Sequence, residues 1–465
     1  MPVRNRREQE LDPKIRDQVN YIIGEFEAHD IPIDYATAAR EPGRKYSAGV
    51  KYIYAKDQLL VLEPHLAGIL ELLRTRFRLG PMRGQLKPFI GDIVLVQLVP
   101  DTSGEDSGTP VQRSPDVIDE CAEAGHVHAA GEQPCVLDIL AAIDEQFGVG
   151  AATPNQVVTV CGDMGPCPAT EPEEVSDGIE PYPGVCPGNG GGGARIWIAD
   201  TGLLNGATLS HPWLNGVEGD PDDRPWTGGM IPVYAGHGTF VAGVVRCMAP
   251  AADIYVANVF DIAGSALESD FVPKLNAALE YGADIIHLTI STLTRKDFPL
   301  QTVGAWLQTL SQDPGAVCVV AAGNDGTDSP SWPAAYSTTA PAGTVVSVGA
   351  LATDWASLAD FSNYGDWVTV YAPGQDLINA FAVGPYECEW SPNKGKIRQF
   401  YGMAQWSGTS FSTPIVTGLI AAQIARSGQN GQDAAQTLLG AAGTMEIPGP
   451  AQGQFLLPSC GEEGE

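Results

Sequence analysis

Four short stretches of this 465-residue chain carry side chains that could cooperate in acyl transfer. They are IADTGL with Asp200, AGHGTFVAGVV with His237, AAGNDG with Asn324 and WSGTSFSTPIVTG with Ser410. A serine hydroxyl can attack a carbonyl carbon while an imidazole takes its proton and a carboxylate orients and stabilises the charged imidazole. An amide side chain, together with the backbone N–H of the serine, can stabilise the oxyanion that forms.

Each stretch also has a purely structural interpretation. The first could be an aspartate turn, the second a helix cap beside a buried histidine, and the third a turn at a strand end. The fourth could be a packing turn whose serine caps a helix. All four follow a predicted strand or begin a predicted helix. This shared placement, in one chain, favours the catalytic interpretation over four coincidences.

The elements that would position these side chains begin at Arg195. Predicted strands RIWIAD, ADIYVANVF, DIIHLTI, AVCVVAAGN and TVVSVGAL alternate with helical segments such as Phe271–Tyr281. Such alternation predicts an α/β fold with a mostly parallel sheet and helices on both faces. Active groups in such sheets lie at the carboxyl ends of the strands, where these motifs fall.

The N-terminal part predicts a second, smaller α/β domain. A helix with an Asp12–Pro13 start covers residues 11–26, and the following segments read β-α-β-loop-α-β, the order of a ferredoxin-like sandwich. The Gly/Ser/Pro/Asp-rich residues 101–134 are expected to be a loop insertion. The resulting organisation is an N-terminal domain (1–160), a Pro/Gly-rich linker (161–193), a catalytic domain (194–458) and an acidic tail (459–465).

Composition restricts the partners. The net charge is −30, which argues against binding nucleic acid or an anionic membrane surface. The charged N-terminus lacks the apolar core of a secretory signal and no stretch reaches membrane-spanning length, so a cytoplasmic protein is expected. Nine cysteines without such a signal favour thiols, although export would allow local pairs such as Cys161–Cys167.

The motifs resemble those of the subtilisin-like (subtilase) serine peptidases, over residues 194–445. The matching residues are Asp200 in ADTGL, His237 in GHGTFVAG, Asn324 in AAGND and Ser410 in SGTSFSTP. The resemblance implies that Asp200 orients His237, that His237 is the general base and then acid, and that Ser410 is the nucleophile. It also implies that Asn324 and the Ser410 N–H stabilise the oxyanion, with no metal in the chemistry.

The resemblance further implies that a protein or peptide substrate binds as an added strand. The substrate-binding residues expected from it are Leu288, Thr289, Ile290, Ala322 and Gly323. The opposite side of the cleft is not assigned, because the Asp-rich loop 217–228 does not align. The chain also departs from the family: His287 replaces an asparagine, Ser291 a glycine and Phe411 a methionine.

Subtilases are often made with a ferredoxin-like pro-region that assists folding and then inhibits the enzyme. Residues 1–160 could be such a pro-region, with the linker as the cleavage region, or an accessory regulatory domain that is never removed. The function expected is therefore a serine endopeptidase, a zymogen under intramolecular inhibition by its N-terminal domain. The alternative is a catalytically quiet descendant that binds peptides in the cleft.

Two weaker patterns concern metals. Cys121, His126, His128 and Cys135 are zinc-type ligands, but their spacing matches no established pattern. A second group of oxygen ligands could bind calcium, as many subtilases do, and comprises Glu218, Asp220, Asp222 and Asp223. That loop lacks the regular spacing of a calcium loop, so a solvated acidic loop is favoured and no cofactor is expected.

Overall fold

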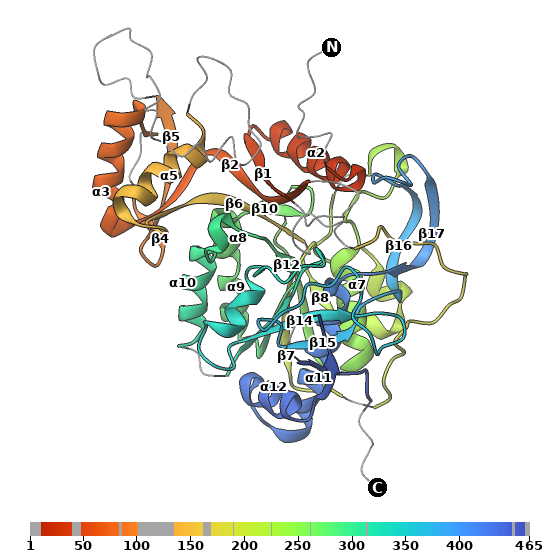
Figure 1. Ribbon diagram of the computed structural model, residues 1–465. Coiled ribbons are helices and arrows are strands. Elements are labelled where there is room, and N and C mark those ends of the chain that lie inside the picture. The colour runs from red at the N-terminus through yellow and green to blue at the C-terminus, as the bar shows by residue number, and fades with distance from the viewer. Residues whose placement is uncertain are drawn as a thin grey trace.

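The computed structural model describes residues 11–39, 48–82, 86–100, 134–160, 169–188, 190–224, 226–260, 262–312, 315–448 and 452–460. Three expected features lie almost wholly outside these ranges. They are the insertion at 101–134, the cysteine–histidine pattern from Cys121 to His128, and residues 161–168 of the linker. A small α/β unit extends to Val160, and a larger one begins at Arg195 (Figure 1).

The small unit has the expected sandwich topology. Its elements are β2 (Ala48–Leu62), α3 (Glu63–Leu72), the π-helical turn η1 (Leu73–Phe77), β3 (Leu79–Pro81), β4 (Pro88–Ile90), β5 (Ile93–Pro100), α5 (Val136–Phe147) and β6 (Ala152–Val160). The strands pair antiparallel in the order β6-β2-β5-β3, which is the strand order of a ferredoxin-like β-α-β-β-α-β unit. Apolar side chains of α3 and α5 pack on this sheet and form the core of the small unit.

Two further elements precede this sandwich. Helix α2 (Pro13–Ala28) begins as the sequence predicts, because the Asp12 carboxylate accepts a hydrogen bond from the Lys14 N–H and Pro13 occupies the first turn. Its buried face, which includes Val19, Ile22 and Phe26, packs against β1 (Ile33–Ala39) and β2. Strand β1 pairs antiparallel with the first half of β2.

The large unit is built on a nine-stranded sheet. Its strands are β7 (Arg195–Asp200), β8 (Glu218–Gly219), β9 (Asp253–Asn258), β11 (Ile285–Leu288), β13 (Val317–Ala321), β14 (Val345–Leu351), β15 (Val370–Pro373), β18 (Gly443–Glu446) and β19 (Gln452–Phe455). The order is β18-β19-β15-β14-β13-β11-β7-β9-β8, and every pair except β18–β19 is parallel. Continuous apolar strands such as β13, buried along their whole length, form cores on both faces.

Helices cover both faces of this sheet, so the predicted fold class is confirmed (Figure 1). They are α6 (Ala207–Ser210), α7 (His237–Met248), α8 (Glu268–Lys274), α9 (Asn276–Tyr281), α10 (Gln301–Leu310), α11 (Thr409–Ser427) and α12 (Gly431–Gly440). A long hairpin, β16 (Leu377–Glu387) and β17 (Ile397–Trp406), leads into α11. No helix among the described residues has the length and apolar character needed to cross a membrane.

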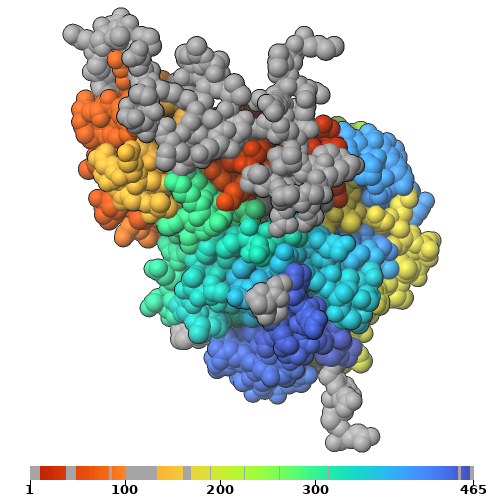
Figure 2. Space-filling model, viewed as in Figure 1, coloured from red at the N-terminus to blue at the C-terminus, as the bar shows by residue number. Residues whose placement is uncertain are grey.

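The two units share strand β6. Its last residues pair antiparallel with β10 (Ser265–Leu267) on one edge and with β12 (Ile290–Ser291) on the other. In this register Thr159 lies opposite both Ser265 and Ser291. The end of the small sheet is thus continuous with two short strands of the large unit. The described N-terminal elements lie directly against the large unit (Figure 2).

The part of the predicted linker that the structure describes is bound to the large unit along its length. Glu173 and Tyr182 form β-bridges with Gln405 and Ile378 of the hairpin. Further along, Cys186 forms a disulfide with Cys460, which the sequence did not predict. Backbone pairing and a covalent bond therefore fix residues 169–188 of this Pro/Gly-rich segment against the large unit.

Candidate active site

Asp200 and His237 meet at the carboxyl edge of the large sheet. Asp200 is the last residue of β7, and His237 is the first residue of α7. Both side chains are fully buried. The imidazole Nδ1 lies 2.8 Å from Oδ1 and 2.9 Å from Oδ2 of the Asp200 carboxylate. Because an ionised carboxylate can only accept, Nδ1 carries the proton and Nε2 is the basic nitrogen.

Further donors hold the Asp200 carboxylate in its ionised form. Thr289 Oγ1 donates to Oδ2 at 2.6 Å, and the Thr201 N–H donates to Oδ1 at 2.7 Å. Burial alone would raise the pKa of Asp200, but the charge of His237 and these hydrogen bonds together lower it. The carboxylate is therefore charged at neutral pH and can stabilise a positive imidazolium.

Ser410 lies in the first turn of α11, directly after Thr409. The next residue, Phe411, places its ring 5.2 Å from the His237 ring, and Trp406 lies 5.5 Å from the same imidazole. The Ser410 hydroxyl is fully buried, and among the described residues it has no hydrogen-bond partner. A buried hydroxyl at a helix N-terminus, one residue before a side chain that contacts a basic imidazole, has surroundings compatible with a nucleophile.

Asn324 follows β13 and contacts the residue before the serine. Its Oδ1 accepts from the Thr409 N–H at 2.8 Å and from Thr409 Oγ1 at 3.0 Å. Since a backbone N–H can only donate, the amide oxygen must face Thr409, and Nδ2 is the end of the amide directed elsewhere. In this orientation Nδ2 is the donor end of the amide, the end that could serve an oxyanion.

The five residues expected to bind substrate separate into different roles. Ile290 belongs to β12, which pairs through its backbone with β6, whereas the Leu288 side chain is in the core. The Thr289 hydroxyl donates to the Asp200 carboxylate. Ala322 and Gly323 donate their backbone N–H groups to Val348 O and Thr409 Oγ1, within the protein.

Sequence reasoning missed the strand that lies across β6 from β12. It is β10, a three-residue strand that pairs with β6 on the edge opposite β12. The Val160 N–H also donates to the Gly264 carbonyl, which extends this pairing by one residue. No sequence signal marks SAL as a strand, because three residues are too few to show alternation.

The departures from the family motif have local compensations. His287 is fully buried, its Nδ1 lies 2.8 Å from Thr417 Oγ1, and burial lowers its pKa to about 3, so it is neutral. Ser291 Oγ is hydrogen-bonded to Ser331 Oγ. Gly323, with φ of +101°, provides the space for it, since a Cβ there would lie 2.6 Å from Ser291 Oγ.

The acidic loop considered for calcium is occupied by protein donors. Asp220 accepts from Tyr255 Oη at 2.7 Å and from the Asn258 N–H at 3.0 Å, and Asp222 is paired with Arg224 at 2.9 Å. Within the described ranges, no three His, Cys, Asp or Glu side chains gather as a metal site.

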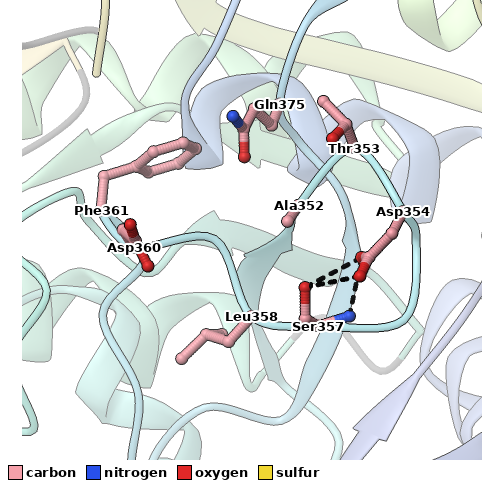
Figure 3. Close-up of a pocket in the computed structure, with 8 residues that line it drawn as sticks. All are labelled: Ala352, Thr353, Asp354, Ser357, Leu358, Asp360, Phe361 and Gln375. Atoms are coloured by element: carbon pink, nitrogen blue, oxygen red, sulfur yellow. Dashed lines mark hydrogen bonds between the residues drawn. The ribbon is translucent and has the colours of Figure 1, made fainter.

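A surface pocket of about 330 Å³ lies beyond the ends of β14 and β15 (Figure 3). Its lining comprises Ala352, Thr353, Asp354, Ser357, Leu358, Asp360, Phe361 and Gln375. The Asp354 carboxylate accepts hydrogen bonds from both the backbone and the hydroxyl of Ser357 (Figure 3). None of the catalytic candidates lines this pocket, so it is separate from the site.

A parallel α/β sheet that holds an aspartate and a histidine in contact at its carboxyl edge, beside a helix whose first turn carries a serine, has the arrangement of an α/β serine hydrolase. The subtilase family profile matches residues 191–453, which is more than half of the chain. The protein therefore belongs to the subtilase family of serine peptidases.

Curated relatives agree with this assignment. The chain is 31% identical over 266 residues to a thermophilic serine proteinase of Bacillus sp. (strain AK1), covering 54% of this chain and 56% of that protein. It is 30% identical over 247 residues to thermitase of Thermoactinomyces vulgaris, covering 49% and 74%. The structure of the prenylagaramide maturation protease PagA has a TM-score of 0.42 at 27% identity, covering 56% and 86%.

Proposed function

We propose that the protein is a serine endopeptidase whose nucleophile is Ser410. The observation that carries this proposal is the paired hydrogen bond from His237 Nδ1 to Asp200, next to the helix start that holds Ser410. In the proposed reaction, His237 Nε2 takes the Ser410 proton as Oγ attacks the peptide carbonyl. The imidazolium, stabilised by Asp200, then protonates the leaving amine, and water hydrolyses the acyl-enzyme by the same route.

Asn324 and the Ser410 N–H are the proposed oxyanion donors. The Thr409 N–H fixes the Asn324 amide oxygen, so Nδ2 needs no reorientation when charge develops. A donor fixed in advance contributes more in the transition state than one that must reorganise.

Hydrolysis of an internally quenched peptide by the full-length protein tests this function. Wild type should cleave the peptide after maturation, and Ser410→Ala should abolish cleavage while its circular dichroism spectrum stays unchanged. If both folded proteins only bind the peptide, the protein is a quiet peptide-binding descendant and the enzyme proposal fails.

We further propose that the N-terminal unit inhibits the site from within the chain. Residues 157–160 of β6 lie between β10 and β12 in an antiparallel arrangement, the way an extended peptide substrate adds to a sheet edge. In the chain described here, His237 and Ser410 have no exposed surface. A strand held in the substrate position would exclude other peptides for as long as the N-terminal unit stays docked.

The intact mass of purified protein over time tests whether this unit is removed. A zymogen would be cut within residues 161–193, and Ser410→Ala would stay whole. A wild type that remains whole and yet cleaves peptides would instead identify a permanent regulatory domain. If wild type stays uncut and a variant without residues 1–160 is equally active, the N-terminal unit does not inhibit the site.

Cellular location is part of this proposal. The Cys186–Cys460 disulfide favours an oxidising compartment over the cytoplasm expected from the sequence, because cytosolic thiols are kept reduced. Mass spectrometry of protein from its native cells, alkylated before lysis, would detect the Cys186–Cys460 peptide pair in an oxidising compartment. Alkylated Cys186 and Cys460 would support the cytoplasm.

A further inference from the structure

The helix that begins at His237 cannot cap itself. Gly236 is its N-cap, with φ of +80°, and Gly238 follows the histidine. A Cβ at Gly238 would lie 2.5 Å from Gly202 O and 3.1 Å from Asp200 Oδ1, so glycine is needed for the helix start to approach Asp200. With glycine on both sides of His237, the first N–H groups need acceptors from elsewhere in the chain.

Two side chains distant in sequence supply these acceptors. Thr201 Oγ1 accepts from the Gly238 N–H at 3.0 Å, and Asp222 Oδ2 accepts from the Gly236 N–H at 2.7 Å. Thr201 Oγ1 also donates to Asp222 Oδ2 at 3.4 Å, which links the two acceptors. In an ordinary capping box, the N-cap and N3 side chains of the helix itself make this pair of bonds.

Arg224 extends the arrangement to the turn before the helix. Its Nε and Nη2 donate to Asp222 Oδ1 at 3.1 and 2.9 Å. Its Nη2 also donates to Tyr234 O at 2.9 Å, and Nη1 donates to Val233 O at 3.4 Å. Tyr234 has φ of +65°, and its carbonyl accepts a hydrogen bond from the His237 N–H. The guanidinium therefore holds in place the residues that orient His237.

We propose that Asp222 and Arg224 are positioning residues for His237, which keep its imidazole against Asp200 by holding the turn 233–236. Both act through the backbone and contact neither the Asp200 carboxylate nor the Ser410 hydroxyl. The Asp222 side chain has no exposed surface, and a buried carboxylate is stable only when it is paired in this way. The inference rests on the proposed peptidase function, because positioning has a consequence only if His237 transfers a proton.

Steady-state kinetics on a short peptide amide test the inference in the protein expressed as the full chain and assayed after release of its N-terminal unit. Asp222→Ala should lower kcat by about 10- to 100-fold, since small misplacements of a catalytic group cost this much. KM should change less than about twofold, because no substrate contact is lost. Arg224→Lys keeps the charge but cannot form the fork, so it should lower kcat by a smaller factor and gives a second test if Asp222→Ala fails to fold.

The decisive comparison adds each change to His237→Ala. If Asp222 and Arg224 act through the histidine, neither change should lower the residual rate of the His237→Ala protein further. Arg246→Lys is the matched control. Arg246 binds the carbonyls of Pro250 and Asn215 at the other end of α7, so this change should lower Tm and leave kcat unchanged.

If Asp222→Ala or Arg224→Lys lowered the rate by the same factor in the wild-type and His237→Ala backgrounds, the inference would be overturned. It would also be overturned if both Asp222→Ala and Arg224→Lys kept the kcat of wild type. A wild type that stays inactive after release of its N-terminal unit would instead refute the proposed function.

Discussion

Two of the catalytic candidates are fixed by a residue that lies outside their own motif. Asp200 is held by Thr289, and the Asn324 amide is held by Thr409. These hydrogen bonds set the direction of the side chain before substrate binds. Orientation in advance is the source of the electrostatic stabilisation that we assign to the oxyanion site.

The first prediction concerns the Asn324 amide. Asn324→Ala should lower kcat by about 10²- to 10³-fold with little change in KM, because a donor to the oxyanion acts only in the transition state. Asn379 is a suitable control, since it is a buried asparagine that pairs with Trp213 and Cys247. Asn379→Ala should lower Tm without this loss of kcat, and an equal loss of kcat in both variants would refute the role of Asn324.

For single residues, the motifs allowed the prediction of which residues form the site but not of all their contacts. Asp200, His237, Asn324 and Ser410 stand in recognisable stretches, so their positions could be proposed from the sequence. The contact of Thr289 with Asp200, and the pairing of Asp222 with Arg224, depend on how distant segments pack. A loop that reads as solvated and acidic therefore contains a fully buried carboxylate.

Among the elements, the long ones could be predicted and the short ones could not. The strands of the large sheet and helix α2 carry clear apolar periodicity or end signals. Strand β10 has three residues, too few to show a periodicity, and its pairing with β6 identifies it. Residues 169–188 lack periodicity, yet backbone bridges and a disulfide order them.

Helix α8 gives a prediction about pH. Glu268, its first residue, is fully buried and accepts from both the N–H and the hydroxyl of Thr302. Burial raises the pKa of Glu268 to about 7, although the Thr302 hydrogen bonds lower it. The folded state then binds the proton more tightly than the unfolded state. Protonation of Glu268 therefore contributes in full to the free energy of unfolding below about pH 4.5, and this contribution is lost as the pH rises to 7.

Glu268→Gln removes this ionisation and keeps the acceptor. The difference in Tm, variant minus wild type, should therefore become more positive between about pH 4.5 and 7 and stay constant above that. Thermal unfolding of both proteins across this range measures it. A difference that does not change with pH, or that becomes more negative, would show that Glu268 is already ionised in the folded protein.

In the whole molecule, described residues of the N-terminal unit contact the large unit at several separate places, among them the following three. The end of β6 lies between β10 and β12, and Asp144 on α5 forms ion pairs with Arg295 and Lys296, both at 2.8 Å. The third place is helix α2, where Asp17 accepts from Ser391 at the tip of the β16–β17 hairpin. Figure 1 shows α2 beside that hairpin and the small sandwich at the opposite end of β6.

The ion pair at α5 allows a test of docking strength. Asp144 and Arg295 are each only 7% exposed, so Asp144→Ala leaves a buried charge without its partner and should weaken docking by about 2–5 kcal/mol. Lys51–Asp297 is the matched control, because this pair is more exposed and should contribute less than about 1 kcal/mol.

Amide hydrogen exchange in the Ser410→Ala background, where no cut occurs, measures both changes. Exchange of residues 152–160 should accelerate in Asp144→Ala and stay nearly unchanged in Lys51→Ala. Equal protection of these residues in all three proteins would mean that the ion pair does not hold the N-terminal unit in place.

Covalent labelling by a fluorophosphonate tests the catalytic assignment most directly. The reagent forms a stable adduct only with a serine activated by a neighbouring base, and peptide mass mapping locates the modified residue. The assignment predicts one adduct, on Ser410, in the wild-type protein after its N-terminal unit has been released. It also predicts no adduct in Ser410→Ala and almost none in His237→Ala. A folded, released wild type that stays unlabelled, or carries its adduct on another serine, would contradict it.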